Sequence, residues 1–329
     1  VDRQQRPLPI MGIAKMGLGE VYREWNRLQK AAALSEEGLA LIQRWGQVGQ
    51  MDGYIWSAQI KQAQRDEAGA VEAMRKAAEL AARFDASQID DYMVGMYRAR
   101  LDIQQGRMEM ARQWLAETGV ADAALPETPY HMWELGRLTL IYLAVAQQDG
   151  SRALALVAEL LPYARAKGRF GILVDLLALQ AVATFYNNQL QEALASLQQS
   201  LTLAAPERYM RIFIDKGDPM KQLLLASQQG NLPPDLQAYT VRLLANFAPT
   251  PPRLAADQKQ KIILIEPLSD RELEVLQCIA AGYSNREIAA QLTIAHSTVK
   301  THINNIYGKL SVKSRTEAIE RARNLGLFA

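Results

Sequence analysis

Cysteine, aromatic residues and long apolar runs are all scarce in this sequence of 329 residues. The single cysteine, Cys278, excludes a disulfide framework within the chain and fits the reducing conditions of the cytoplasm. No apolar run approaches the roughly 18 residues that a membrane-spanning helix requires, and the first residues do not resemble a secretory signal. We therefore expect a cytoplasmic protein with no membrane partner.

The motifs of enzymes and of cofactor sites are missing as well. The chain has no Gly-x4-Gly-Lys-Ser/Thr phosphate loop, no glycine-rich dinucleotide motif, no Gly-x-Ser-x-Gly and no His or Cys at metal-binding spacing. The sequence therefore predicts no enzyme activity, no cofactor and no metal; a helical-repeat enzyme would need a catalytic constellation that these residues lack. Because the chain begins at Val1 and not at methionine, we expect a piece of a longer protein.

The residues that are abundant favour helices. Hydrophobic residues make up 49% of the chain, which supports a sizeable core. Ala, Leu and Gln are frequent, whereas aromatic residues contribute only 7% and no long Val/Ile run occurs. We therefore predict an all-α protein, and the length indicates about two domains.

Five alanines recur at nearly equal spacing before position 206, with steps of 39, 41, 42 and 40 residues. Each follows a short polar or glycine-containing turn that has an apolar helical pattern on either side. A small side chain at this point lets the two helices of a pair approach closely. The spacing predicts helix pairs that stack into a solenoid. The five residues are Ala31, Ala70, Ala111, Ala153 and Ala193.

The predicted solenoid is tetratricopeptide-like, although its period near 40 residues exceeds the usual length of about 34. An ordinary helical bundle with chance similarity is the alternative, and the near-equal steps argue against it. On the concave surface of a solenoid we expect a small-molecule effector or a regulatory protein to bind. The tryptophans are expected to pack mainly between repeats, and an aromatic lining of the groove is the second interpretation.

A change of composition near position 249 marks a domain boundary. The repeat fades from Arg208 to Phe247, a stretch that we expect to cap the solenoid. Prolines follow at 249, 251 and 252 without apolar periodicity, which is typical of a linker. The sequence therefore predicts a repeat domain over 1–248, a linker over 249–266 and a small domain over 267–329.

Three Ser-x-x-Glu boxes organise the small domain. They run from Ser269 to Glu272, from Ser284 to Glu287 and from Ser314 to Glu317, and each precedes apolar residues at helical spacing. A further helix lies between the second and third boxes, because apolar residues at steps of 4, 3 and 4 share one face of it. Four short helices are expected, with C-terminal caps at Gly282 and Gly326. The apolar residues of the third helix are Val299, Ile303, Ile306 and Leu310.

The opposite face of the third helix is polar and basic. Lys300 and Asn304 are four residues apart and share this face, with Thr301 beside them. No acidic residue occurs from Ala295 to Thr316, and residues 284–329 carry a net charge of +4, so the remainder carries −2. Lysine can donate to guanine and asparagine can bond adenine bidentately, which suits a DNA major groove. A solvated polar face on a structural helix is the alternative.

This segment resembles the LuxR/FixJ-type helix-turn-helix domain over about the last sixty residues. The resemblance implies a tetrahelical domain whose third helix enters the major groove, with Lys300, Thr301 and Asn304 facing base edges. It places Ser297, Thr298, Lys309 and Arg315 near phosphates. The matching positions include Leu268, Arg271, Glu272, Val275, Leu276, Gly282, Ser284, Asn285, Glu287, Ile288, Ala289, Leu292, Thr298, Val299, Lys300, His302, Ile306, Lys309, Leu310, Val312, Arg315 and Ala318.

One position departs from this family. Ala295 stands just before the third helix, where the family usually has serine. An alanine cannot cap a helix through its side chain, and losing an N-cap costs about 1 kcal/mol. Ser297 is therefore expected to cap a slightly shorter helix.

The order of solenoid, linker and helix-turn-helix also resembles the C-terminal part of the large ATP-binding, MalT-like LuxR-type activators, as does the stretch from Ala205 to Asp215. The resemblance implies a bacterial DNA-binding transcription regulator, expected to be an activator, that senses an effector through its repeats. It further implies self-association on promoter DNA, pairing of subunits through residues 314–325, and contact with RNA polymerase. ATP binding would belong only to a longer parent protein. An interaction scaffold whose terminal bundle binds protein is the alternative function.

Overall fold

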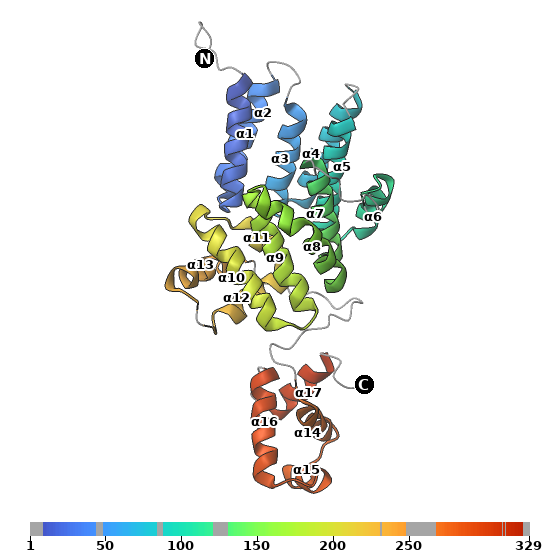
Figure 1. The fold of residues 1–329 in the computed structure, drawn as a ribbon, viewed down its shortest axis with the longest axis vertical. Coiled ribbons are helices and arrows are strands. Elements are labelled where there is room, and N and C mark those ends of the chain that lie inside the picture. The colour runs from blue at the N-terminus through green and yellow to red at the C-terminus, as the bar shows by residue number, and fades with distance from the viewer. Residues whose placement is uncertain are drawn as a thin grey trace. The chain divides into compact units, whose positions relative to one another are not determined.

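The computed structural model describes residues 9–43, 49–83, 88–120, 131–230, 232–247, 268–310, 312 and 314–324. Within these ranges all regular secondary structure is helical, which confirms the predicted all-α class (Figure 1). The chain divides into two compact units, Val1–Ala248 and Pro249–Ala329, which are described separately. The linker expected over 249–266 and the cap expected at Gly326 lie outside the described residues.

Five helix pairs form most of the first unit, and within each pair the two helices pack against each other (Figure 1). This arrangement confirms the helical-repeat solenoid. The pairs are α1 (Pro9–Glu24) with α2 (Leu28–Gln43), α3 (Gln50–Ala63) with α4 (Glu67–Arg83), α5 (Gln88–Gln104) with α6 (Met108–Glu117), α7 (His131–Ala146) with α8 (Gly150–Ala166), and α9 (Phe170–Tyr186) with α10 (Leu190–Glu207).

The five recurring alanines each lie in the first turn of the second helix of a pair, and each is fully buried, at 0% exposure. The residue five positions earlier has a left-handed backbone in all five turns. In the fourth turn, Gln148 donates its N–H to Val145 O at 3.0 Å and Asp149 donates to Ala144 O at 2.9 Å, which is the Schellman arrangement. The sharp turn and the small alanine thus recur together. The left-handed residues are Asn26, Arg65, Gly106, Gln148 and Asn188.

Three shorter helices follow the fifth pair. They are α11 (Arg211–Ile214), α12 (Gly217–Ser227) and α13 (Pro234–Leu244). Helix α12 packs on α9 and α10, and α13 packs on α10 and α12, so these two cover the end of the solenoid as expected for a cap. Helix α11 behaves differently, because it packs on α9 and also on α1, at the opposite end of the sequence of repeats.

The second unit contains the four predicted helices: α14 (Asp270–Ala280), α15 (Asn285–Gln291), α16 (His296–Leu310) and α17 (Arg315–Asn324). Complete capping boxes begin α14 at Ser269 and α15 at Ser284. At the third box the Glu317 N–H donates to Ser314 Oγ at 3.2 Å. Gly282 has φ +89° after α14, as its predicted cap role requires.

The apolar faces of these helices meet in one core. All four apolar residues predicted for the third helix are buried, with exposures between 0% and 9%. Because this side of α16 is fixed against α14 and α15, its other side is fixed toward solvent. The buried core residues are Leu268, Val275, Leu276, Ile279, Ile288, Val299, Ile303, Ile306, Leu310, Ala318 and Ala322.

Candidate nucleic-acid interface and effector cavity

The solvent side of α16 carries the residues predicted to contact bases. Lys300, Thr301 and Asn304 are all exposed. Successive residues of a helix are about 100° apart, so a line of exposed residues runs down the helix directly opposite the buried Val299–Leu310 face. We call this line the outer strip, with Lys300 beside it. The outer strip consists of Ser297, Thr301, Asn304 and Gly308.

The hydroxyl of Thr301 is bound within the helix. Its Oγ1 donates to the carbonyl oxygen of Ser297 at 3.2 Å. The hydroxyl proton is therefore committed, and Thr301 can offer a partner only its methyl group and an acceptor lone pair.

The expected cap at Ser297 is wrong. Helix α16 begins at His296, and the first helical bond runs from the Val299 N–H to the Ala295 carbonyl at 3.1 Å. Ala295 thus occupies the N-cap position itself, and Ser297 lies within the first turn. The packing of Val299 and Ile303 fixes the start of the helix despite the missing cap side chain.

Lys309 is held within the unit. Its ammonium group donates to Glu272 Oε2 at 2.8 Å, and its side chain is 22% exposed against 4% for Glu272. Burial alone would raise the pKa of Glu272, but the bonds from Lys309 and Ser269 outweigh it and hold that pKa below its usual value. One carboxylate therefore caps α14 and ties α14 to the end of α16.

Two arginines tie helix ends to other helices. Arg315, another predicted phosphate contact, donates to the carbonyl oxygens of Ile279 and Tyr283 at 3.0 and 2.7 Å. Arg271 donates to the carbonyl oxygen of Leu292, the residue that ends α15. Both guanidinium groups satisfy carbonyls at helix C-termini. The resemblance includes Arg271, but nothing local to its sequence predicts this bond.

A cavity of ≈ 260 Å³ with both polar and apolar walls lies in the repeat unit. The first helix of every pair contributes to its wall, as does α11, so it occupies the concave side of the solenoid. Tyrosines, glutamines and charged side chains contribute to the wall. No tryptophan occurs among its described lining residues, which supports the expectation that the described tryptophans serve packing. Polar lining residues include Gln59, Gln62, Tyr97, Arg100, Gln104 and Tyr142.

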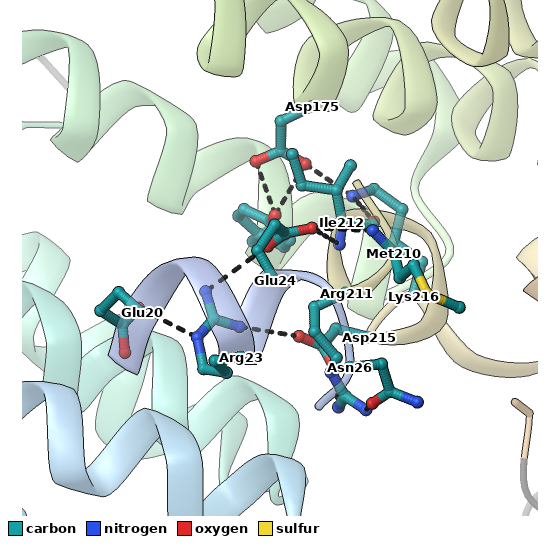
Figure 2. A network of polar contacts seen from close by, with 11 residues as sticks. Glu20, Arg23, Glu24, Asn26, Asp175, Met210, Arg211, Ile212, Asp215 and Lys216 are labelled. Carbon is teal, nitrogen blue, oxygen red and sulfur yellow. Dashed lines mark hydrogen bonds and ion pairs between the residues drawn. The ribbon is translucent and has the colours of Figure 1, made fainter. Parts of the chain in front are cut away.

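Helix α11 lies against the end of α1, and polar contacts join the two elements (Figure 2). Glu24 accepts the backbone N–H groups of Met210 and Ile212 at 3.2 and 2.9 Å, and so caps the start of α11. Arg23 lies 3.8 Å from the Asp215 carboxylate in the same cluster. Burial raises the pKa of Glu24, with Arg23 and the Ile212 N–H opposing the shift. The first repeat is thereby joined to the segment after the fifth.

The same cluster continues into a buried ion pair. Lys216 donates to Asp175 Oδ1 at 2.6 Å, and the two side chains are only 2% and 10% exposed. Tyr142 donates its hydroxyl to the same carboxylate at 2.7–2.8 Å. Burial first, and then the charge of Asp175, hold the pKa of Tyr142 well above its usual value, so the phenol stays a donor. Figure 2 shows Asp175 and Lys216 beside the α1–α11 junction.

Nowhere in the described ranges do three or more His, Cys, Asp or Glu side chains gather in a way that could bind a metal ion. Among the helices described, none is both long and apolar enough to cross a membrane.

Two family models match the chain. The model described as MalT-like TPR region matches residues 1–229, and the model described as bacterial regulatory proteins, luxR family, matches residues 266–322. Together they cover the repeat unit and the helix-turn-helix unit.

Curated relatives carry the same name. The HTH-type transcriptional regulator MalT of Serratia proteamaculans (strain 568) is 26% identical over 328 residues, covering 93% of this chain and 35% of that protein. Its counterparts in Yersinia pestis (strain Pestoides F) and Yersinia pseudotuberculosis serotype O:1b (strain IP 31758) are 34% identical over 148 residues, covering 41% of this chain and 16% of theirs. The chain thus spans about a third of the length of the Serratia protein.

A solenoid of five helix pairs and a four-helix unit with a polar outer strip agree with both matches in order and extent. The chain belongs to the family defined by the MalT-like tetratricopeptide region, and it ends in a domain of the luxR family of bacterial regulatory proteins.

Proposed function

We propose that the chain is part of a bacterial transcription regulator that binds promoter DNA through α16. The observation that carries the proposal is the polarity of this helix. One side is packed in the core, and the other presents Lys300, Thr301 and Asn304 to solvent. The names of the relatives and the luxR-family match support the same function.

Each residue of the exposed face has a role that its chemistry allows. Lys300 would donate to guanine O6 and N7, and Asn304 would bond adenine bidentately. Thr301 has its hydroxyl proton committed to Ser297, so we assign it to contact with a thymine methyl group. These three contacts would supply the sequence preference.

Phosphate contacts would position the helix. Ser297 and Thr298 are exposed in the first turn of α16, where backbone N–H groups are also available to an anion. Lys309 and Arg315 are bonded within the unit, so their first role in the proposal is to hold α16 and α17 in place. In the proposal, contact of Lys309 and Arg315 with phosphate is a secondary role.

Lys300→Ala is expected to weaken binding to a preferred duplex about 5- to 150-fold, because a specific base contact is worth about 1–3 kcal/mol. The duplex would be selected by this protein from a randomised pool, and affinity would be measured by fluorescence anisotropy between about 50 and 200 mM salt. Binding of the parent chain should weaken steeply with salt, since phosphate binding releases counterions.

A matched control removes the same charge elsewhere. Lys76→Ala, at an exposed position of α4, should bind the duplex as the parent does. Equal affinity of the Lys300→Ala and parent chains would exclude the assigned role. A parent chain that shows no salt-dependent DNA binding, but captures a protein through α14–α17, would favour the scaffold function instead.

We further propose that the cavity of the repeat unit binds a small polar effector. Its wall combines amide, phenol and guanidinium groups that can donate to hydroxyl or carboxylate oxygens. Its position against α11 would let a ligand act on the junction of α1 with α11. A regulatory protein on the concave surface is the second candidate, since solenoids bind partners there.

Calorimetric titration of the chain against a panel of small polar metabolites tests this effector proposal. For any metabolite that binds, Gln59→Ala and Tyr97→Phe are each expected to weaken binding roughly three- to tenfold, the worth of one hydrogen bond. Gln198→Ala, on the exposed face of α10, is the control and should leave affinity unchanged. If neither cavity substitution changes the affinity for a metabolite, that metabolite binds elsewhere and the cavity assignment fails.

Activation of transcription, self-association and contact with RNA polymerase complete the proposed function. Helix α17 is the element that we assign to pairing of subunits on DNA. ATP binding has no assigned residues in this sequence.

A further inference from the structure

Arg100 differs from the other cations around the cavity of the repeat unit. Its Nε donates to Thr139 Oγ1 at 2.9 Å, and its Nη2 donates to the carbonyl oxygen of Leu135 at 3.0 Å. Both acceptors are neutral, and within the described ranges no carboxylate pairs with this guanidinium and no acceptor meets its Nη1. Because Arg100 lines the cavity, it brings a positive charge without a counter-ion to the wall.

Three carboxylates line the same cavity, and each is already paired with a cation other than Arg100. None of these pairs leaves a carboxylate for Arg100. A charged group that is partly withdrawn from water is unfavourable unless it gains a partner of opposite charge. The pairs are Glu24 with Arg23 at 3.6 Å, Asp175 with Lys216 at 2.6 Å, and Asp215 with Arg211, and Arg23 also binds Glu20 at 3.0 Å.

The groups beside Arg100 in the cavity wall are neutral and can form hydrogen bonds. Tyr97 and Gln104 lie one turn before it and one turn after it on α5, so the three residues share the face that lines the cavity. Burial raises the pKa of Tyr97 and the charge of Arg100 opposes this shift, which shows that the two groups interact. Gln59 lines the cavity from α3. Phenol and amide groups can both donate to and accept from hydroxyl groups.

The size of the cavity limits the ligand. Its volume of ≈ 260 Å³ corresponds to about nine water molecules at about 30 Å³ each. The cavity therefore has room for a small metabolite.

We propose that the effector of this cavity carries a carboxylate group, which binds the Arg100 guanidinium through Nη1, and hydroxyl groups, which bond to Gln59, Tyr97 and Gln104. Its chemical class is that of the hydroxy acids and sugar acids. An amino acid fits this wall poorly, because the carboxylates that would receive its ammonium group are already paired. The inference rests on the proposed effector site and names the class of ligand for it.

Matched pairs of a hydroxy acid and its primary amide test the preference for a charged ligand. Calorimetric titrations of the full chain at pH 7 would use lactate with lactamide, glycerate with glyceramide, and gluconate with gluconamide. At least one acid should bind about tenfold more tightly than its amide, because hydrogen bonds between charged groups are about twice as strong as neutral ones. Arg100→Gln should remove this preference, whereas Arg100→Lys, which keeps the charge, should retain most of it.

Arg98→Gln is the matched control, because Arg98 is exposed on the same helix and is not among the described residues that line this cavity. It should keep the preference of the parent chain. The ratio of acid to amide affinity is compared within each variant, so a general loss of stability from the missing bonds to Leu135 and Thr139 affects both ligands alike.

Two results would overturn the inference directly: an amide that binds the parent chain as tightly as every acid that binds, or an Arg100→Gln chain that still prefers the acid. A cavity that takes a neutral metabolite and none of the acids would also overturn it, and would leave the proposed effector site standing. If neither these acids nor any other metabolite binds, the effector site and the inference both fail.

Discussion

Asp175→Ala is expected to destabilise the repeat unit by about 3–5 kcal/mol, the largest effect of any substitution considered for this chain. The substitution leaves the Lys216 ammonium, which is only 2% exposed, without its carboxylate partner. It also removes the acceptor of the Tyr142 hydroxyl. A buried charge without a partner costs far more than the ion pair itself contributes.

Urea unfolding followed by tryptophan fluorescence measures this effect selectively. All five tryptophans lie before residue 134, so the signal reports on the repeat unit and not on α14–α17. Asp218→Ala, at an exposed carboxylate on α12, is the control and should change stability by less than about 0.5 kcal/mol.

A double substitution separates charge burial from loss of packing. Asp175→Asn combined with Lys216→Met removes both charges and keeps an acceptor for Tyr142. It should recover most of the stability, since replacing a buried pair by neutral groups is often close to neutral. If Asp175→Ala costs less than about 1 kcal/mol, the ion pair is not buried in solution as the structure has it.

Glu272→Ala is expected to cost the helix-turn-helix unit about 3 kcal/mol. Loss of the capping box at Ser269 accounts for about 1 kcal/mol. The rest comes from leaving Lys309 without its buried partner, at the low end of the range for buried pairs because Lys309 is 22% exposed. Native-state hydrogen exchange of α14 and α16 peptides measures the free energy of opening in the full chain.

Glu274→Ala is the matched control, two residues along α14. Its ion pair with Arg271 lies on the surface, with both side chains more than a third exposed, so its loss should cost less than about 1 kcal/mol. DNA affinity should fall with Glu272→Ala at temperatures where the unit opens. Equal exchange rates in the two variants would contradict the role given to Glu272.

The bond between Glu272 and Lys309 makes the stability of the helix-turn-helix unit depend on pH. The folded-state pKa of Glu272 lies below its unfolded value. The stability that ionised Glu272 contributes is therefore fully present at pH values above the unfolded-state pKa of glutamate, about 4.3. It is lost as pH falls through the lower folded-state pKa. Glu272→Gln should lack this loss, so its unfolding free energy should fall less than that of the parent chain on acidification, after correction of exchange rates for pH.

The sequence alone determined the helices and their closest packing. The recurring alanines predicted where paired helices touch, and Ala153 is fully buried as expected. The Ser-x-x-Glu boxes at Ser269 and Ser284 predicted where α14 and α15 begin. The four-residue spacing of Lys300 and Asn304 predicted that they share an exposed face. These features follow from rules that span a few residues, so they can be recognised before any coordinates are known.

Only the tertiary structure decided which charges meet. Glu24 caps a helix that begins 186 residues further along the chain. Lys216 forms an ion pair with Asp175, 41 residues before it in the sequence. The bond of Lys309 to Glu272 likewise gave a predicted phosphate contact a structural role. Helical periodicity determines the face of a charged side chain but not its partner, because the partner depends on how successive helix pairs stack and curve. The contact of α11 with α1, and with it one wall of the cavity, joins segments that are far apart in the sequence.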